Sequence, residues 1–217
     1  MGAEVLGYAL KPEVGCLFEK IYGDELVTSI TGDICDVGQL TQAIHSFKPE
    51  IVIHLAAQST VPECLARPQY AYATNVMGTV NLLEAVRFCQ SVKSVVVVTT
   101  DKVYENKGDG AVYSEVDPLG GSDIYSASKV CVEYVVESYK QSFFQTESRL
   151  VGVATARASN VLAGGDHLRS RLIPAVLDSF ASGETIQLRH PQQTRPWQSV
   201  LDALNGYLAL GRLLYSK

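Results

Sequence analysis

The chain has 217 residues, of which 47% are hydrophobic and 19% charged, so it holds enough apolar material for one large buried core. Its formal net charge is −5 at pH 7 and no run of lysines and arginines appears, which argues against nucleic-acid binding. The five cysteines form no CxxC pair and lie at no metal-ligand spacing, so we expect reduced, mostly buried thiols and no metal site. No stretch resembles a membrane span or a signal peptide, and we expect a cytoplasmic protein without a membrane partner.

Short β-branched runs alternate with longer amphipathic runs, the pattern of parallel strands joined by crossover helices. Strands are expected over residues 4–10, 26–30, 50–55, 94–100 and 150–157, and helices over residues 37–47, 68–89 and 123–144. The strand at 94–100 is apolar on both faces, which predicts a central position in the sheet.

Beyond Asn160 the alternation becomes irregular, with a helix expected over residues 168–181, a short strand over 185–188 and a helix over 200–214. The sequence therefore predicts an α/β fold with a doubly wound parallel sheet in residues 1–160. Residues 161–217 are expected to form a smaller substrate-binding region beside it.

A tyrosine and a lysine four residues apart, Tyr125 and Lys129, lie near the start of the helix predicted over 123–144. This spacing puts both side chains on one helical face. A nearby ammonium group favours the phenolate, so Tyr125 could act as a general base toward a sugar hydroxyl. Taken alone, the pair fits a solvated helix face better, because both residues are common.

Other segments of the sequence favour a functional role for this pair, because they follow one another in a consistent order along the chain. The HLAAQ segment at 54–58 closes a predicted strand with small residues, Asn75 lies on the next helix, and TTDK at 99–102 ends the following strand. In doubly wound sheets the ligand crevice lies beyond the carboxyl ends of the strands, where these segments fall. We therefore expect them to meet in one site.

At these landmarks the chain resembles the extended short-chain dehydrogenase/reductase family. The resemblance implies a Rossmann-like fold, NAD as cofactor, and Thr100, Tyr125 and Lys129 as the catalytic Thr-Tyr-Lys set. It also implies a set of cofactor-binding residues, namely Asp33, Ile34, Leu55, Ala56, Ala57, Gln58, Asn75, Thr99, Tyr125 and Lys129. Lys129 would hydrogen-bond the nicotinamide ribose, and Asn75 would support the site.

Asp33 and Asp36 follow a predicted strand in the segment GDICD. The family places the first aspartate of such a segment and the next residue against adenine, which favours adenine contact for Asp33 and Ile34. Aspartate is also common at helix N-caps and in turns, so capping is the alternative for Asp33 and the expectation for Asp36.

Asp101 and Lys102 directly follow the catalytic threonine, where the family's 4,6-dehydratases need a further acid and base. The string TTDKVYENK and residues 118–125 resemble the members that convert CDP-glucose to a 4-keto-6-deoxy sugar. By this resemblance, Tyr125 takes the 4-hydroxyl proton while hydride leaves C4 for NAD. Lys102 then acts at C5 or stabilises the enolate, Asp101 protonates the departing 6-hydroxyl, and hydride returns to C6. The alternatives are an exposed loop cation for Lys102 and an epimerase or reductase activity.

Two later segments, ARASNVLAGGD at 156–166 and RPWQ at 195–198, also resemble the family. They imply that Asn160, Arg169 and Arg195 bind the nucleotide diphosphate of a nucleotide-sugar substrate, since arginine makes bidentate phosphate bonds. Ser159 departs from the family's usual glycine and His167 from a frequent tryptophan. Arg169 fits the solvated face of a helix equally well.

The resemblance also implies a homodimer formed through the helices at 68–89 and 123–144, whose apolar stripes fit an ordinary core as well. The family's GxxGxxG loop does not occur in this chain, and residues 1–8 resemble the family's second strand. We therefore expect a sheet without its first strand, either with a gap and two open edges or with neighbours that close up. Three interpretations follow: a piece of an active dehydratase, another activity on the same scaffold, or a non-catalytic remnant.

Overall fold

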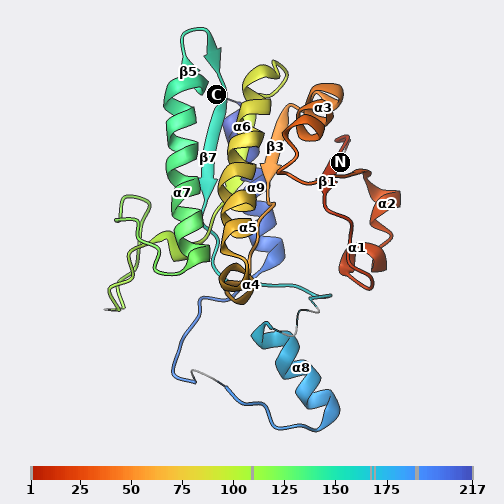
Figure 1. Cartoon of the computed structure of the whole chain (residues 1–217), viewed down its shortest axis with the longest axis vertical. Helices are drawn as coiled ribbons and strands as arrows, with labels where there is room; N and C mark the ends of the chain where they lie inside the picture. The colour runs from red at the N-terminus through yellow and green to blue at the C-terminus, as the bar shows by residue number, and fades with distance from the viewer. Residues whose placement is uncertain (1, 109, 167, 169, 189–190, 217) are drawn as a thin grey trace.

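The computed structural model describes residues 2–108, 110–166, 168, 170–188 and 191–216 (Figure 1). The fold is α/β, as the sequence predicts. The strands are β1 (Leu6–Ala9), β2 (Thr28–Thr31), β3 (Ile51–His54), β4 (Ser94–Val98), β5 (Gln145–Thr146), β6 (Arg149–Leu150), β7 (Gly152–Ala156), β8 (Val161–Leu162) and β9 (Gln198–Ser199). The α-helices are α1 (Leu17–Lys20), α2 (Gly23–Leu26), α3 (Val37–Phe47), α4 (Val61–Ala66), α5 (Pro68–Tyr72), α6 (Gly78–Phe88), α7 (Ile124–Tyr139), α8 (Leu172–Ser182) and α9 (Val200–Tyr215).

The main strands form two separate parallel sheets. β4 lies between β3 and β7 in one sheet, and β1 pairs with β2 in the other. The central position predicted for β4 is confirmed, and its Val95, Val96 and Val97 are fully buried. Within the described residues no hydrogen-bonded ladder joins β1 to β3, so the sheet has the expected gap rather than neighbours that close up.

The three-stranded sheet is covered on both faces, because successive strand side chains point to opposite sides. Val95 and Val97 belong to a large cluster with residues of α3, α6 and α7. Val96 packs on the other face against Ala203 and Tyr207 of α9. Figure 1 shows α9 behind the sheet, α6 and α7 in front of it, and α8 apart from both layers.

Two expected helices contain π-helical turns. The stretch predicted over 68–89 consists of α5, a π-helical turn η1 (Ala73–Met77) and α6. The stretch predicted over 123–144 consists of α7 and a second π-helical turn, η3 (Lys140–Phe144). Such turns widen the helix locally while the apolar pattern continues, so periodicity does not reveal them.

Side chains of aspartate define where two helices begin. Asp36 accepts a hydrogen bond from the main-chain N–H of Gln39 at 3.0 Å, which confirms the predicted cap of α3. Asp123 accepts from the N–H groups of Tyr125 and Ser126 at 2.9 and 3.1 Å and forms a capping box with Ser126. The start of α7, and hence the orientation of Tyr125, is therefore set locally.

Several sequence expectations were wrong. The strand expected over residues 185–188 does not form: α8 ends at Ser182, its C-cap Gly183 adopts a left-handed conformation with φ of 71°, and residues 184–188 belong to no strand. Residue 26 ends α2 instead of starting a strand. All five cysteines are free, but only Cys64 and Cys89 are buried, so the thiols are not mostly buried.

None of the helices in the described part of the chain has the length and hydropathy needed to cross a bilayer.

Candidate active site

The carboxyl end of β4 leads into a short 3₁₀ turn, η2 (Asp101–Val103), which carries two of the predicted catalytic residues. Thr100 is buried, and its hydroxyl donates to Asp101 Oδ1 at 3.1 Å and accepts from the N–H of Lys102 at 3.3 Å. Asp101 is half-buried and Lys102 is exposed. The threonine thus caps the turn and holds the following aspartate and lysine directly beyond the strand.

Tyr125 lies in the first turn of α7 and faces this strand end. Burial raises the pKa of Tyr125 to about 12, a hydrogen bond with Thr100 lowers it in part, and the charge of Asp101 raises it. The Lys102 ammonium lies 5.9 Å from the centroid of the Tyr125 ring. Thr100, Asp101, Lys102 and Tyr125 therefore converge, and burial keeps the phenol of Tyr125 in its protonated form.

Lys129 follows one turn later on α7 and is only 4% exposed. Its ammonium donates to the main-chain carbonyl of Val98 at 2.9 Å. Burial lowers the pKa of Lys129 to about 8, and the charge of Glu133 opposes this shift. Two of the three ammonium hydrogens remain available to other acceptors.

Asn75 lies in the π-helical turn between α5 and α6 and is almost fully buried. Its Oδ1 accepts from the N–H of Gln58 at 2.7 Å, and its Nδ2 donates to the Gln58 carbonyl at 3.1 Å and to Ser128 Oγ at 2.8 Å. Ser128 in turn donates to the carbonyl of Tyr125 at 2.7 Å. Asn75 therefore connects the loop after β3 to the helix that carries the tyrosine.

The loop after β3 is formed by small residues at its centre. Ala56, Ala57 and Gln58 are half-buried, whereas Leu55 is 56% exposed. The backbone of this loop is held at Gln58 by Asn75, and Ala56 packs against the main core. The arrangement gives a fixed backbone surface beside α7.

Asp33 and Ile34 lie beyond the end of β2. Asp33 accepts from the N–H of Cys35 at 2.9 Å through Oδ1, and its main-chain carbonyl accepts from the Tyr8 hydroxyl at 3.0 Å. Ile34 is buried, and its carbonyl accepts from Asn81 Nδ2 at 3.0 Å. Asp33 therefore stabilises its own turn, while side chains of β1 and α6 hold the segment in place.

The predicted diphosphate contacts lie near β8 and β9. The Asn160 carbonyl accepts from the N–H of Gln198 at 3.0 Å, and the Ser159 hydroxyl donates to the Pro196 carbonyl at 2.6 Å. The serine that departs from the family pattern thus links these two segments. Arg195 is exposed and donates to the Thr194 carbonyl and to Gln193 Oε1 at 2.9 and 2.7 Å. Arg169 and His167 lie outside the described residues.

Four buried or half-buried residues near Asn75, Thr100 and Lys129 were not among the residues predicted from the sequence: His54, Thr79, Glu133 and Arg157. The first two form one pair, with His54 Nε2 3.0 Å from Thr79 Oγ1, and the other two form an ion pair at 3.0 Å. Glu133 was detectable as the residue four positions after Lys129 on the same helical face. Across the described residues, no group of three or more histidines, cysteines and acids is placed to hold a metal ion.

Residues 2–214 match the model of the NAD dependent epimerase/dehydratase family, and the chain belongs to that family. It is 45% identical, over its whole length, to CDP-glucose 4,6-dehydratase of Salmonella typhimurium, of which it covers 62%. It is 30% identical to dTDP-glucose 4,6-dehydratase of Xanthomonas campestris pv. campestris, with 85% of the chain and 54% of that protein covered.

Among solved structures, the chain is similar to DesIV, a dTDP-glucose 4,6-dehydratase from Streptomyces venezuelae, solved as a double mutant with NAD bound. The TM-score is 0.82 at 26% identity, and 96% of this chain and 63% of that chain are covered. The chain thus spans less than two thirds of the length of each of these three relatives.

Proposed function

We propose that the chain carries the catalytic part of an NAD-dependent nucleotide-sugar 4,6-dehydratase that converts CDP-glucose to CDP-4-keto-6-deoxyglucose. The observation that carries this proposal is the convergence of Asp101, Lys102 and Tyr125 at the end of β4. Dehydration needs an acid and a base in addition to the tyrosine, whereas epimerisation at C4 does not need that pair. The 45% identity to a CDP-glucose 4,6-dehydratase supports the choice of nucleotide.

The residues present fit NAD, which would accept hydride from C4 of the sugar and return it to C6. Ala56 and Ala57 leave backbone accessible beside Gln58, and Lys129 keeps two ammonium hydrogens for a ribose. Within the described residues, the buried hydroxyl of Thr74, next to Asn75, has no partner in hydrogen-bonding geometry, and the Cys35 side chain lies near it. Asp33 and Ile34 would contact the adenine, and Leu55, Asn75 and Thr99 would complete this proposed site.

In the mechanism that we propose, Tyr125 removes the proton of the 4-hydroxyl group. With a pKa near 12, the phenol must be helped by positive charge, which the Lys129 and Lys102 ammonium groups supply. Lys102 then either takes the C5 proton, in its neutral amine form, or stabilises the enolate as an ammonium. A proton returns to C5 after hydride has reached C6. Asp101, which accepts a hydrogen bond from Thr100, delivers a proton to the departing 6-hydroxyl group.

Asn160, Arg169 and Arg195 are proposed to bind the nucleotide diphosphate. Arg195 would exchange its hydrogen bonds to Thr194 and Gln193 for hydrogen bonds to phosphate oxygens. This exchange costs little free energy because Thr194 and Gln193 are exposed. We also propose the division into residues 1–160 for the cofactor and 161–217 for the sugar nucleotide, and a cytoplasmic location.

A homodimer through α5, α6 and α7 is a further part of the proposal. Large side chains of η1, α6 and α7 are exposed, with Met77, Phe88 and Tyr134 at 53, 60 and 63%. Sedimentation should give a dimer for the natural chain and a monomer for Tyr134→Glu. A natural chain that sediments as a monomer at all concentrations would contradict this part.

The test of the function uses the 217-residue chain with NAD and CDP-glucose. Calorimetry should show one NAD per chain, and mass spectrometry should show a product that has lost one water. Tyr125→Phe should abolish the product, and Asp101→Asn should slow water loss while C4 oxidation persists. Binding without water loss would instead favour an epimerase or reductase, and a folded chain that binds neither ligand would refute catalysis by this chain.

A further inference from the structure

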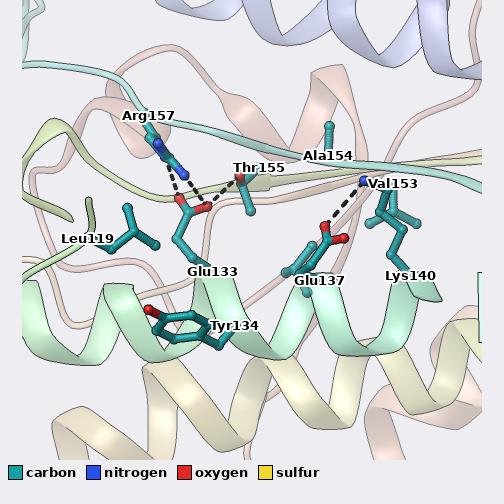
Figure 2. A pocket seen from close by; sticks show the side chains of 10 residues that line it. Leu119, Glu133, Tyr134, Glu137, Lys140, Val153, Ala154, Thr155 and Arg157 are labelled. Atoms are coloured by element: carbon teal, nitrogen blue, oxygen red, sulfur yellow. Dashed lines mark hydrogen bonds and ion pairs between the residues drawn. The ribbon is translucent and has the colours of Figure 1, made fainter. Parts of the chain in front are cut away.

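Glu133 of α7 is a buried carboxylate that accepts four hydrogen bonds. Figure 2 shows those from Thr155 and Arg157. Oε1 accepts from Thr99 Oγ1 at 2.5 Å and from Arg157 Nε at 3.0 Å. Oε2 accepts from Thr155 Oγ1 at 2.8 Å and from Arg157 Nη2 at 3.0 Å. Each carboxylate oxygen therefore accepts two hydrogen bonds, and these bonds hold α7 against the carboxyl ends of β4 and β7.

The bonds of Glu133 reach the strand end that carries the candidate catalytic threonine. Lys129 donates to the carbonyl of Val98, and Glu133, one turn later, accepts from the side chain of Thr99. Two successive turns of α7 thus hold two successive residues of the chain at the end of β4. The next residue is Thr100, whose side chain lies beside that of Tyr125 of α7.

The stability of the fold does not by itself explain why a buried ion pair of Glu133 and Arg157 lies here. A buried ion pair carries a desolvation cost that its Coulomb energy often only offsets, and apolar residues of similar volume can be as stable. Glu133 and Arg157 have side chains only 6% and 15% exposed. Glu137, one turn further along α7, has the usual environment of a helical glutamate: its side chain is 52% exposed, and its carboxylate accepts hydrogen bonds from Lys140 and Gln141.

We propose that Glu133 is a positioning residue for the Tyr125 site, which fixes the Thr99–Thr100 strand end against α7 and holds its carboxylate one helical turn from Lys129. The pocket of about 330 Å³ beside it is lined by Glu133 and Arg157 but not by Tyr125 or Lys129. Glu133 therefore acts through Thr99, Thr100 and Lys129 and does not touch the substrate. The catalytic part of this inference rests on the proposed function, and its electrostatic part does not.

The electrostatic part concerns the ionisation of Lys129. Burial lowers the pKa of Lys129 to about 8, and Glu133 raises it. Other titratable groups border Lys129 or Tyr125. They are His54 at the end of β3, Cys64 of α4, Asp101 and Lys102 of η2, and Asp123 at the N-cap of α7. Removing the negative charge of Glu133 would leave the effect of burial on the pKa of Lys129 less compensated. Lys129 would therefore lose its proton at lower pH.

The first experiment follows Lys129 in the 217-residue chain labelled with ¹³C at lysine Cε, with the resonance assigned by its loss in Lys129→Met. The NMR titration midpoint should move to lower pH in Glu133→Gln and stay unchanged in the matched control Glu137→Gln. In Arg157→Met it should move to higher pH, because Glu133 then acts without a neutralising guanidinium. These opposite shifts separate an electrostatic role from general loosening of the fold.

A folded Glu133→Gln chain whose Lys129 titrates as in the natural chain would overturn the proposal. If Glu133→Gln does not fold, the Arg157→Met titration decides, and an unchanged or lower midpoint there would overturn it.

The second experiment measures turnover of CDP-glucose. Glu133→Gln should reduce kcat by about 10- to 100-fold with KM little changed, as expected when catalytic groups lose their alignment. The alkaline limb of its pH profile should shift to lower pH together with the Lys129 midpoint. Unchanged kcat in the variant would refute the positioning role. If the natural chain itself shows no turnover, the proposed function fails, and the titration still decides the role of Glu133.

Discussion

Replacing His54 by glutamine should make the stability of this fold less sensitive to acid. His54 is 5% exposed, and its Nε2 lies 3.0 Å from Thr79 Oγ1. Thr79 donates its own hydrogen to the Asn75 carbonyl at 2.6 Å, so Nε2 of the neutral ring must be the donor in the first bond. Burial, together with the positive charge of Lys129, lowers the pKa of His54 to about 3.

The sign of the effect follows from this depressed pKa. The unfolded chain takes up a proton on His54 near pH 6.5, whereas the folded chain resists it down to about pH 3. The stabilisation is therefore complete above pH 6.5 and is lost as the pH falls from there toward 3. Between pH 8 and pH 5, this one group should lower the free energy of unfolding by ~2 kcal/mol.

Urea denaturation followed by circular dichroism at pH 8, 6.5 and 5 measures this term. Glutamine keeps an N–H donor for Thr79 but does not titrate, so His54→Gln should lose ~2 kcal/mol less than the natural chain between pH 8 and 5. The control is His45→Gln, which removes an exposed histidine that contacts the Ala85 carbonyl at 3.2 Å. An equal loss of stability in His54→Gln and the natural chain would refute the reasoning.

Three further substitutions test how the elements around the site are held. Arg149→Met should destabilise the fold by about 2–4 kcal/mol in urea denaturation, because the guanidinium donates to three carbonyls at the end of α6, at 2.5 to 2.9 Å; a loss below 0.5 kcal/mol would count against it. Asp123→Ala should cost about 1 kcal/mol through the lost capping box of α7, while Asp123→Asn should retain most of the stability. Gly152→Ala should lower Tm, because the added Cβ would lie 2.5 Å from the Leu214 carbonyl of α9, and an unchanged Tm would contradict that close contact.

Features that depend on neighbouring residues were predictable from the sequence. The apolar run of β4 indicated a central strand, and the helix over 37–47 was predicted with its bounds and its Asp36 cap. The spacing of Tyr125 and Lys129 placed both residues on α7, and the order of the TTDK and HLAAQ segments indicated where the site would form. The strand, the helix and the Tyr125–Lys129 pair rest on periodicity or on hydrogen bonds within one turn, and the order of the segments rests on the rule that ligands bind beyond the carboxyl ends of parallel strands.

The tertiary structure decided which of these residues act on one another. Asn75 binds Gln58 across 17 residues and Ser128 across 53, and Glu133 binds Thr99 across 34, so no local pattern encodes any of these three contacts. The direction of Lys129 toward the Val98 carbonyl and of Lys102 toward the Tyr125 ring also depends on how α7 packs on β4. Periodicity within the chain determines which face of an element is buried, whereas the pairing of buried polar groups depends on which elements become neighbours, because a buried donor or acceptor must find its partner there.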